Sequence, residues 1–316
     1  MKKILIVSEE EILNDPRSKF IIYDLIESNY QISILNYRSI KKNIKINKNC
    51  KLFYFEKKKL KNNFLNNILW ILTKIDFNIY QDLNKIENNS FDVIICINTK
   101  IAKTIAKYFY NSDSQLILDL QDSLPDSYNS WYQHYSYFKS FLYKLFLPFS
   151  EIKNYEKSIL DKYHNILLTT YEAKNRIKKY YGKKFLKKIV ILENYDDFNT
   201  KIFIKKKSIK SYIIYFGSFA PHRGLETIIK SAYLLRKYNF IKFLIIGGAF
   251  GHHYTKSLIE KKNNLKLRNL KILKWQNKKF LKKYSKKKSV GIIPHIKNQH
   301  TDSTVPFKLF QYMDQN

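Results

Sequence analysis

The segment FGSFAPHRGLE (216–226) places two glycines and an arginine in one short loop. Glycine allows positive φ angles and close approach of the backbone to a ligand, and Arg223 supplies a fixed positive charge. Gly217 ends an apolar run and Gly224 opens a helical pattern, whose N-terminus favours a phosphate group. The loop matches neither GxGxxG nor a Walker pattern. We interpret it as a diphosphate site; the alternative is turn glycines beside a surface arginine.

Further glycines and most of the histidines follow apolar runs in the same half of the chain. Gly247 and Gly248 end the run IKFLII, and Gly251 lies close behind. The histidines concerned are His222, His252, His253, His295 and His300. They are expected to gather at one edge, where they would bind phosphate or sugar or remain solvated loop residues. No carboxylate or thiol completes a recognisable metal spacing, so no metal is predicted.

The segment PHIKNQHTDSTVPFK (294–308) leads into a predicted final helix. Ser303 or Thr304 is expected to cap this helix, and Pro306 suits its first turn. Lys308 and Gln311 are three residues apart and therefore share one face, from which they can reach a ligand. The alternative gives the helix a packing role, in which its apolar residues fill the core: Phe307, Leu309, Phe310 and Met313.

Strand and helix patterns alternate along the chain and predict where these loops lie. Short Ile- and Val-rich runs precede amphipathic helices, the pattern of βα units on a parallel sheet. Strands are expected at 3–8, 91–99, 114–122 and 164–170, with a loop after the third that holds Asp119, Gln121 and Asp122. The pattern restarts at SYIIYFG after an irregular stretch. We predict an α/β protein with domains at 1–195 and 211–316, a linker at 196–210, and ligands at the carboxyl ends of the strands.

Composition limits the choice of partner and compartment. The chain of 316 residues carries a net charge of +32, but only six of its residues are arginine. Lysine-filled surface positions explain this composition as well as an anion or membrane preference does, and nucleic acid is not the expected partner. Two cysteines without metal spacing, no signal peptide and no long apolar run indicate a cytoplasmic protein. FKSFLYKLFLPFSEIKNYEK, interrupted by Pro148, is expected to pack between helices, with contact at a lipid surface as the alternative.

Taken in order, these motifs resemble the retaining, nucleotide-sugar-dependent glycosyltransferases of GT-B architecture, group 1 (family 4). NDPRSKF, LILDLQDSLPD, VILENYDDF, FGSFAPHRGLE, LIIGGAFG and HTDSTVPFKLFQYM are similar to successive family segments across nearly the whole chain. The resemblance implies two Rossmann-like domains with parallel sheets. It also implies transfer of a sugar from a nucleoside diphosphate sugar to a polysaccharide or lipid-linked glycan, without a cofactor or metal.

The resemblance assigns roles to particular residues. The donor site would include Gly217, Ser218, Arg223, Gly224, Gly247, Thr304, Lys308 and Gln311. Arg223 matches the phosphate-binding lysine of the family, and Gln311 matches the glutamate used on the donor ribose. Asp122 and Gln121 would form the catalytic acceptor side, although Gln121 replaces a histidine and has no proton-handling role. Ser218 replaces an arginine and thereby removes one cation, and Ser303 stands at the first glutamate position.

The family pattern continues beyond the final helix, whereas this chain ends at MDQN. We therefore expect a second domain that is truncated and incomplete, impaired activity, and greater exposure of Phe310 and Met313 than in a complete enzyme. Two other functions stay open. One is a sugar-nucleotide epimerase of the same architecture, and the other is a non-catalytic remnant that binds partners through its basic charge. Peripheral contact with the inner, anionic face of the cytoplasmic membrane is a further expectation.

Overall fold

The computed structural model describes residues 1–8, 12, 15–36, 50–54, 63–84, 90–132, 137–194, 210–248, 252–285 and 287–313. The chain forms two compact units. Unit 1 comprises Met1–Asn129 and Tyr137–Asn194, and unit 2 comprises Ser130–Ser136 and Tyr195–Asn316. The predicted linker at 196–210 lies outside the described residues except for Lys210, and so does Gly251.

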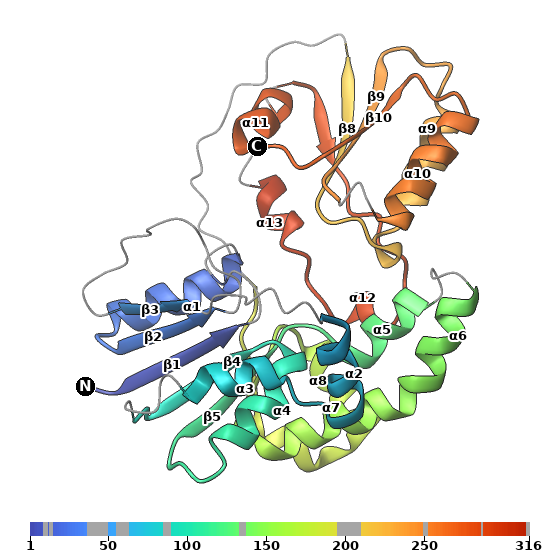
Figure 1. Cartoon of the computed structure of the whole chain (residues 1–316). Coiled ribbons are helices and arrows are strands. Elements are labelled where there is room, and N and C mark those ends of the chain that lie inside the picture. Colours follow the sequence, from blue (N-terminus) through green and yellow to red (C-terminus); the bar gives the residue numbers. More distant parts are fainter. Residues whose placement is uncertain are drawn as a thin grey trace. The chain divides into compact units, whose positions relative to one another are not determined.

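Unit 1 is built on a parallel sheet whose strand order is β3-β2-β1-β4-β5-β6-β7 (Figure 1). The central strands are nearly continuous runs of Ile, Leu and Val, as expected of strands that are buried on both faces. The strands are β1 (Lys3–Ser8), β2 (Gln31–Asn36), β3 (Cys50–Tyr54), β4 (Val93–Ile97), β5 (Gln115–Leu120), β6 (Asn165–Leu168) and β7 (Ile189–Ile191). The chain reverses its winding direction after β3, which places the ends of β1 and β4 side by side.

Helices cover both faces of this sheet. Ile22 of α1 packs with Ile4 and Ile6 on one face. On the other face, Tyr163, which directly follows α7, donates a hydrogen bond to the Ala102 carbonyl of α4 at 2.9 Å. The helices are α1 (Pro16–Glu27), α2 (Asn63–Thr73), α3 (Phe77–Leu83), α4 (Thr99–Tyr108), α5 (Leu124–Tyr132), α6 (Tyr137–Phe146), α7 (Phe149–Lys162), α8 (Tyr171–Tyr181) and the 3-10 helix η3 (Lys183–Lys188). Unit 1 is therefore a doubly wound, Rossmann-like domain.

Unit 2 repeats the architecture on a smaller parallel sheet of order β10-β9-β8-β11. Tyr215 and Phe243 belong to the core cluster on one face, and Ile214 and Leu244 belong to the cluster on the other. Its strands are β8 (Ser211–Phe216), β9 (Ile241–Ile246), β10 (Leu270–Leu273) and β11 (Ser289–Gly291). Its helices are η4 (Pro221–Arg223), α9 (Leu225–Leu234), α10 (His253–Asn264), α11 (Lys278–Ser285), α12 (Gln299–Asp302) and α13 (Lys308–Met313). The predicted fold class, two Rossmann-like α/β domains with parallel sheets, is confirmed.

The segment before the last helix differs from the prediction. The sequence did not indicate the short helix α12, which begins with a capping box between Asn298 and Thr301. The hydroxyl of Ser303 donates to the Gln299 carbonyl at 2.9 Å, and that of Thr304 to the Thr301 carbonyl at 3.4 Å. Capping of α13 by Ser303 or Thr304 is therefore wrong, because both hydroxyls bond to carbonyls of α12.

The last helix, α13, does not pack through the apolar residues that the alternative interpretation placed in the core. Leu309 is 44% and Met313 is 49% exposed, and Phe310 is only half-buried. The hydroxyl of Tyr312 instead accepts a hydrogen bond from the Phe216 amide at 2.9 Å. Lys308, four residues earlier and hence on the same side of the helix, is 7% exposed. The buried side of α13 is therefore its polar, Lys308 and Tyr312 side.

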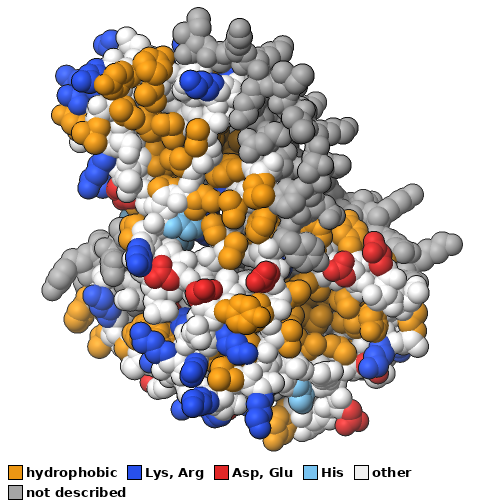
Figure 2. Space-filling view, turned by 180° about the vertical axis from the view of Figure 1, so that it is seen from behind, with side chains coloured by type: hydrophobic (Ala, Val, Ile, Leu, Met, Phe, Trp, Pro, Cys, Tyr) orange, Lys and Arg blue, Asp and Glu red, His pale blue; other side chains and the backbone are white. Residues whose placement is uncertain are grey.

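The aromatic and lysine-rich segment around Pro148 also departs from the expectation. Proline separates α6 from α7, as predicted, but Phe141, Leu145 and Phe146 of α6 are 55%, 60% and 58% exposed. Packing of this segment between helices is therefore wrong for these three side chains. On the face drawn in Figure 2, hydrophobic side chains form several contiguous areas, with Lys and Arg side chains beside them. Within the described ranges, no helix has the length and apolar character needed to cross a bilayer.

Candidate functional site

In unit 2, glycines at the carboxyl ends of β8 and β9 shape a close cradle. Gly217 directly follows β8 and has a φ of 150°, and Gly247 directly follows β9 and has a φ of 134°. A Cβ on Gly217 would lie 2.2 Å from Cε of Lys308, and one on Gly247 would lie 2.0 Å from the Gly217 carbonyl oxygen. Because a side chain fits at neither position, these two glycines allow the strand ends and Lys308 to approach one another.

Lys308 is a buried cation without a carboxylate partner. Its side chain is 7% exposed, and its ammonium lies 5.1 Å from the centroid of the Tyr215 ring. None of the ion pairs found in the described part of the chain involves it. Burial, together with the nearby charge of Arg223, lowers the pKa of Lys308 to about 7. A buried, unpaired ammonium costs free energy, which an anionic ligand at this position would offset.

Arg223 lies next to this cation and is oriented by a histidine. Its Nη1 donates a hydrogen bond to Nε2 of His295 at 3.0 Å. Gly224, with φ of 67°, follows it and forms the N-cap of α9. A Cβ on Gly224 would lie 1.8 Å from the Pro294 carbonyl oxygen, so this loop and the segment after β11 are in direct contact. The guanidinium is therefore held at the N-terminus of a helix, where an anion is favoured.

His222 and His295, which lie beside Arg223, stay neutral near pH 7. Burial, followed by the charge of Arg223, lowers the pKa of His222 to about 2 and that of His295 to about 3. The ring of His222 lies 4.6 Å from that of His300, and both of its nitrogens are buried without a hydrogen-bond partner. In the described ranges, no group of three or more His, Cys, Asp or Glu side chains is placed to hold a metal ion. These rings therefore offer neutral hydrogen-bonding groups beside two cations.

The structure brings only some of the predicted donor-site residues together. It brings Gly217, Gly247 and Lys308 into contact, and Arg223 is close enough to lower the pKa of Lys308. Ser218 is exposed, and its carbonyl accepts a hydrogen bond from the Tyr215 hydroxyl at 2.7 Å. The Thr304 hydroxyl bonds to α12, and Gln311 is half-buried on α13. Sequence reasoning missed Tyr215 and Tyr312 because an aromatic residue in a strand or helix carries no signal that separates core from site.

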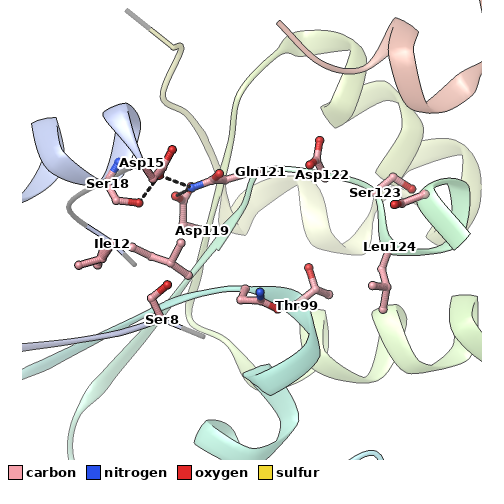
Figure 3. A pocket seen from close by; sticks show the side chains of 13 residues that line it. Ser8, Ile12, Asp15, Ser18, Thr99, Asp119, Gln121, Asp122, Ser123 and Leu124 are labelled. Atoms are coloured by element: carbon pink, nitrogen blue, oxygen red, sulfur yellow. Dashed lines mark hydrogen bonds between the residues drawn. The ribbon is translucent and has the colours of Figure 1, made fainter. Parts of the chain in front are cut away.

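In unit 1, a cavity of about 230 Å³ opens at the carboxyl ends of β1, β4 and β5 (Figure 3). Ten of its lining residues are labelled in Figure 3, among them Asp119 of β5 and Gln121 and Asp122, which follow this strand. The complete lining is Ser8, Ile12, Asp15, Ser18, Ile97, Asn98, Thr99, Asp119, Gln121, Asp122, Ser123, Leu124 and Ser127. The predicted loop position is confirmed for Gln121 and Asp122 and is wrong for Asp119, which belongs to β5 because its backbone pairs with Ile97 of β4.

A buried ion pair fixes one wall of this cavity. Arg17 Nη2 lies 2.9 Å from Asp119 Oδ1, and both side chains are at most 3% exposed. Nη1 of Arg17 also donates to the carbonyl of Leu192. The Gln121 carboxamide donates to Asp119 Oδ2 at 3.0 Å, whereas Asp122 is exposed on the loop. Sequence reasoning gave Arg17 no role, although it stands in the quoted segment NDPRSKF, because its partner lies 102 residues away.

A second buried network positions the other wall. Glu156 of α7 is fully buried and forms an ion pair with Arg176 of α8 at 2.7 Å. The same carboxylate accepts a hydrogen bond from the Leu124 amide, at the start of α5, at 3.2 Å. Tyr181 adds a third contact through its hydroxyl at 2.5 Å. The loop that carries Asp122 therefore runs between two anchored points, Asp119 and Leu124.

Comparisons with known proteins identify the fold. No family model and no curated protein matches the sequence. Among solved structures, the sucrose-phosphate synthase from Thermosynechococcus elongatus is similar with a TM-score of 0.69 and 11% identity, over 93% of this chain and 76% of that one. The Anabaena protein HepE in complex with UDP-glucose is similar with a TM-score of 0.57 and 12% identity, over 88% of this chain and 70% of that one. The lipopolysaccharide outer core galactosyltransferase WaaB is similar with a TM-score of 0.57 and 14% identity, over 100% of this chain and 78% of that one. The chain therefore has the GT-B fold, with two Rossmann-like domains.

Proposed function

We propose that this protein is a glycosyltransferase that moves a sugar from a nucleoside diphosphate sugar to a polysaccharide or lipid-linked glycan acceptor. The observation that carries the proposal is the buried ammonium of Lys308, which lies against Gly217 near Arg223 and has no carboxylate partner among the described residues. Two cations, a glycine cradle and a helix N-terminus are the groups that bind a diphosphate. Two structural neighbours are complexes with UDP-glucose and with UDP and glucose, which is the same class of ligand.

In this proposal the two units have separate tasks. Unit 2 binds the donor, and Arg223 and Lys308 neutralise the diphosphate as it leaves, which lowers the energy of the transition state. Unit 1 binds the acceptor in the cavity beside Gln121 and Asp122. Gln121 has no acid or base function, so it orients a hydroxyl by hydrogen bonds. The fixed cations and backbone amides supply the positive charge that the reaction needs, and neither cofactor nor metal is part of the proposal.

Thermal unfolding with nucleotides tests the donor site. A ligand that binds only the folded state at a concentration about 100-fold above its Kd stabilises by about 2.7 kcal/mol. We expect UDP, ADP or GDP to raise the melting temperature and the matching nucleoside to leave it unchanged. Lys308→Met should abolish the rise in melting temperature caused by the diphosphate. Lys230→Met, which removes an exposed lysine of the same unit, should preserve this rise. Protection by none of the three diphosphates would contradict the proposal.

Product analysis separates transfer from epimerisation. The assay incubates the chain with a labelled nucleotide sugar, with and without a glycan acceptor. A transferase requires the acceptor for label to appear in a glycan and releases a nucleoside diphosphate. An epimerase would instead change the sugar in the absence of any acceptor. A basic binding protein would do neither, and its binding to nucleic acid would weaken steeply with salt.

Peripheral membrane contact is a separate part of the proposal. Phe141, Leu145 and Phe146 are exposed on α6, and the net charge of +32 favours an anionic surface. Exposed apolar side chains together with basic charge are the combination that holds a helix at a lipid interface. Cosedimentation with phosphatidylglycerol vesicles should exceed that with phosphatidylcholine vesicles. Leu145→Glu should weaken it, whereas Leu72→Glu, at a 73% exposed position on α2, should not.

A further inference from the structure

The cavity of unit 1 is acidic, although the chain as a whole is strongly basic. The sequence contains 58 Lys and Arg against 26 Asp and Glu. The cavity lining nevertheless includes three aspartates, Asp15, Asp119 and Asp122, and no lysine or arginine among the described residues. Arg17 offsets the charge of Asp119 by a buried ion pair, which leaves Asp15 and Asp122. Figure 3 shows these carboxylates along one side of the cavity.

Helix N-termini at the cavity do not compensate for this negative charge, because two of them are already capped. The Asp15 carboxylate accepts hydrogen bonds from the Ser18 amide at 3.0 Å and from the Ser18 hydroxyl. The Asn98 carboxamide oxygen accepts from the Lys100 amide at 2.9 Å. These are the backbone donors that a phosphate would use at the starts of α1 and α4.

The third N-terminus, that of α5, is occupied in the same way. The Ser123 hydroxyl accepts a hydrogen bond from the Asp126 amide at 3.3 Å, and Glu156 accepts from the Leu124 amide at 3.2 Å. The carboxylate of Asp126 also accepts a hydrogen bond from the Ser123 hydroxyl. Among the described residues, a negatively charged ligand would therefore meet carboxylates and already bonded amides, and the one nearby guanidinium, that of Arg17, is paired with Asp119.

We propose that this cavity admits an uncharged, hydroxyl-bearing sugar group and excludes groups that carry phosphate or carboxylate. The inference rests on the proposed function, because it specifies the acceptor of that reaction. Carboxylate and carboxamide oxygens of Asp122 and Gln121 accept hydrogen bonds from sugar hydroxyls, whereas an anion has no proton to donate. The volume of about 230 Å³ lies below the usual range for drug-sized ligands, about 300–1,000 Å³, and suits one small group.

Ligand-observed NMR titration of the full chain tests this selectivity. The probes are methyl β-D-glucopyranoside, its 6-phosphate and methyl β-D-glucuronide, which share one ring and differ in charge. Saturating UDP is added in a parallel series, so that binding of phosphate to the cationic site of unit 2 is identified and subtracted. We expect the uncharged glycoside to bind at least about tenfold more tightly than either anionic one, since like charges in contact disfavour binding.

Charge reversal localises the effect. Asp122→Lys should bring the affinity for the 6-phosphate to at least that for the uncharged glycoside. The control Asp113→Lys makes the same change at an exposed aspartate that does not line this cavity, and it should leave the preference intact. Equal binding of charged and uncharged probes, binding of none of them, or no response to Asp122→Lys would each overturn the inference. Protection of the same protein by UDP reports on the donor site separately, so failure of the proposed function is distinguishable from failure of the inference.

Discussion

Arg223 donates a hydrogen bond to Nε2 of His295 at 3.0 Å. Arginine has only donors, so this nitrogen accepts, and the imidazole is the neutral form with its proton on Nδ1. The pKa of His295 is held at about 3 by burial and then by Arg223, which keeps the ring in this form near neutral pH. The histidine thereby orients the guanidinium without neutralising it, and Arg223 keeps its full charge for a ligand.

The first prediction concerns Gly217. Replacement by alanine places a methyl group 2.2 Å from Cε of Lys308 at a φ of 150°, so the lysine must move. We expect a loss of about 1–3 kcal/mol of unfolding free energy and a loss of nucleotide protection. Gly182→Ala is the matched control, because its φ is 85° and no heavy atom lies within 4 Å of the added Cβ. Chemical denaturation should show destabilisation for both, and UDP titration should show a binding defect for Gly217→Ala alone.

The second prediction follows from the lowered pKa of Lys308. Its pKa is about 7 in the folded protein against 10.5 for a free lysine, so between these values the unfolded state binds more protons. Folding stability should therefore rise as the pH increases from about 7 to about 10. Lys308→Met should reduce this slope and should stabilise the protein at neutral pH, because it removes an unpaired buried charge. Urea denaturation across this range measures both effects; an unchanged slope in the variant would contradict the assignment.

The third prediction concerns proton uptake on nucleotide binding. A bound diphosphate favours the charged form of Lys308 and raises its pKa, so the lysine should take up a proton when binding occurs at about pH 8. Isothermal titration of UDP in buffers of different ionisation enthalpy measures the number of protons exchanged. Lys230→Met should retain the uptake. If the wild-type heat does not depend on the buffer, Lys308 does not contact the phosphates.

The fourth prediction concerns acid conditions. Burial and the charge of Arg223 hold the pKa of His222 at about 2, well below its value of 6.5 in an unfolded chain. As the pH falls below about 6.5, the unfolded state binds a proton that the folded state does not, so stability should decrease. His222→Phe should flatten this dependence because it removes the titrating ring. Urea midpoints at about pH 5 and about pH 7 provide the comparison, and an unaltered difference in the variant would refute the role of His222.

The fifth prediction concerns the wall of the acceptor cavity. Arg17→Met leaves Asp119 as a buried carboxylate without its cation, which should cost about 3–5 kcal/mol of unfolding free energy. Lys184→Met removes one partner of an exposed ion pair with Asp161 and should cost only about 0–1 kcal/mol. Equilibrium denaturation compares the two. Similar small losses in both variants would mean that Asp119 is solvated rather than held by Arg17.

Local pattern was sufficient for the elements and for part of the donor site. The expected first strand coincides with β1 (Lys3–Ser8), and the strand expected at 164–170 contains β6 (Asn165–Leu168). Apolar periodicity is a property of neighbouring residues, so it is readable without the fold. Gly217 and Gly224 were likewise predicted as turn positions, and both have positive φ. The domain boundaries at 1–195 and 211–316 stay a prediction.

Predictions from the local sequence pattern were wrong where a polar residue has more than one hydrogen-bonding partner within reach. Ser303 and Thr304 were predicted to cap α13, but α12 lies within reach and takes their hydroxyls. The alternative interpretation placed Leu309 and Met313 in the core, but both are exposed because α13 packs through Tyr312 and Lys308. Phe310 and Met313 are accordingly not fully buried.

The sequence by itself determined the α/β class, the alternation of strands and helices, and the turn positions of Gly217 and Gly224, because each depends on residues close together in the chain. The tertiary structure alone decided which charges are paired. Arg17 meets Asp119 across 102 residues, whereas Lys308 reaches Gly217 and meets no carboxylate in the part of the chain that the structure describes. Electrostatic interactions depend on distance and burial in space, and neither is encoded by spacing along the chain. The cationic site of unit 2 and the acidic cavity of unit 1 therefore emerge only on folding.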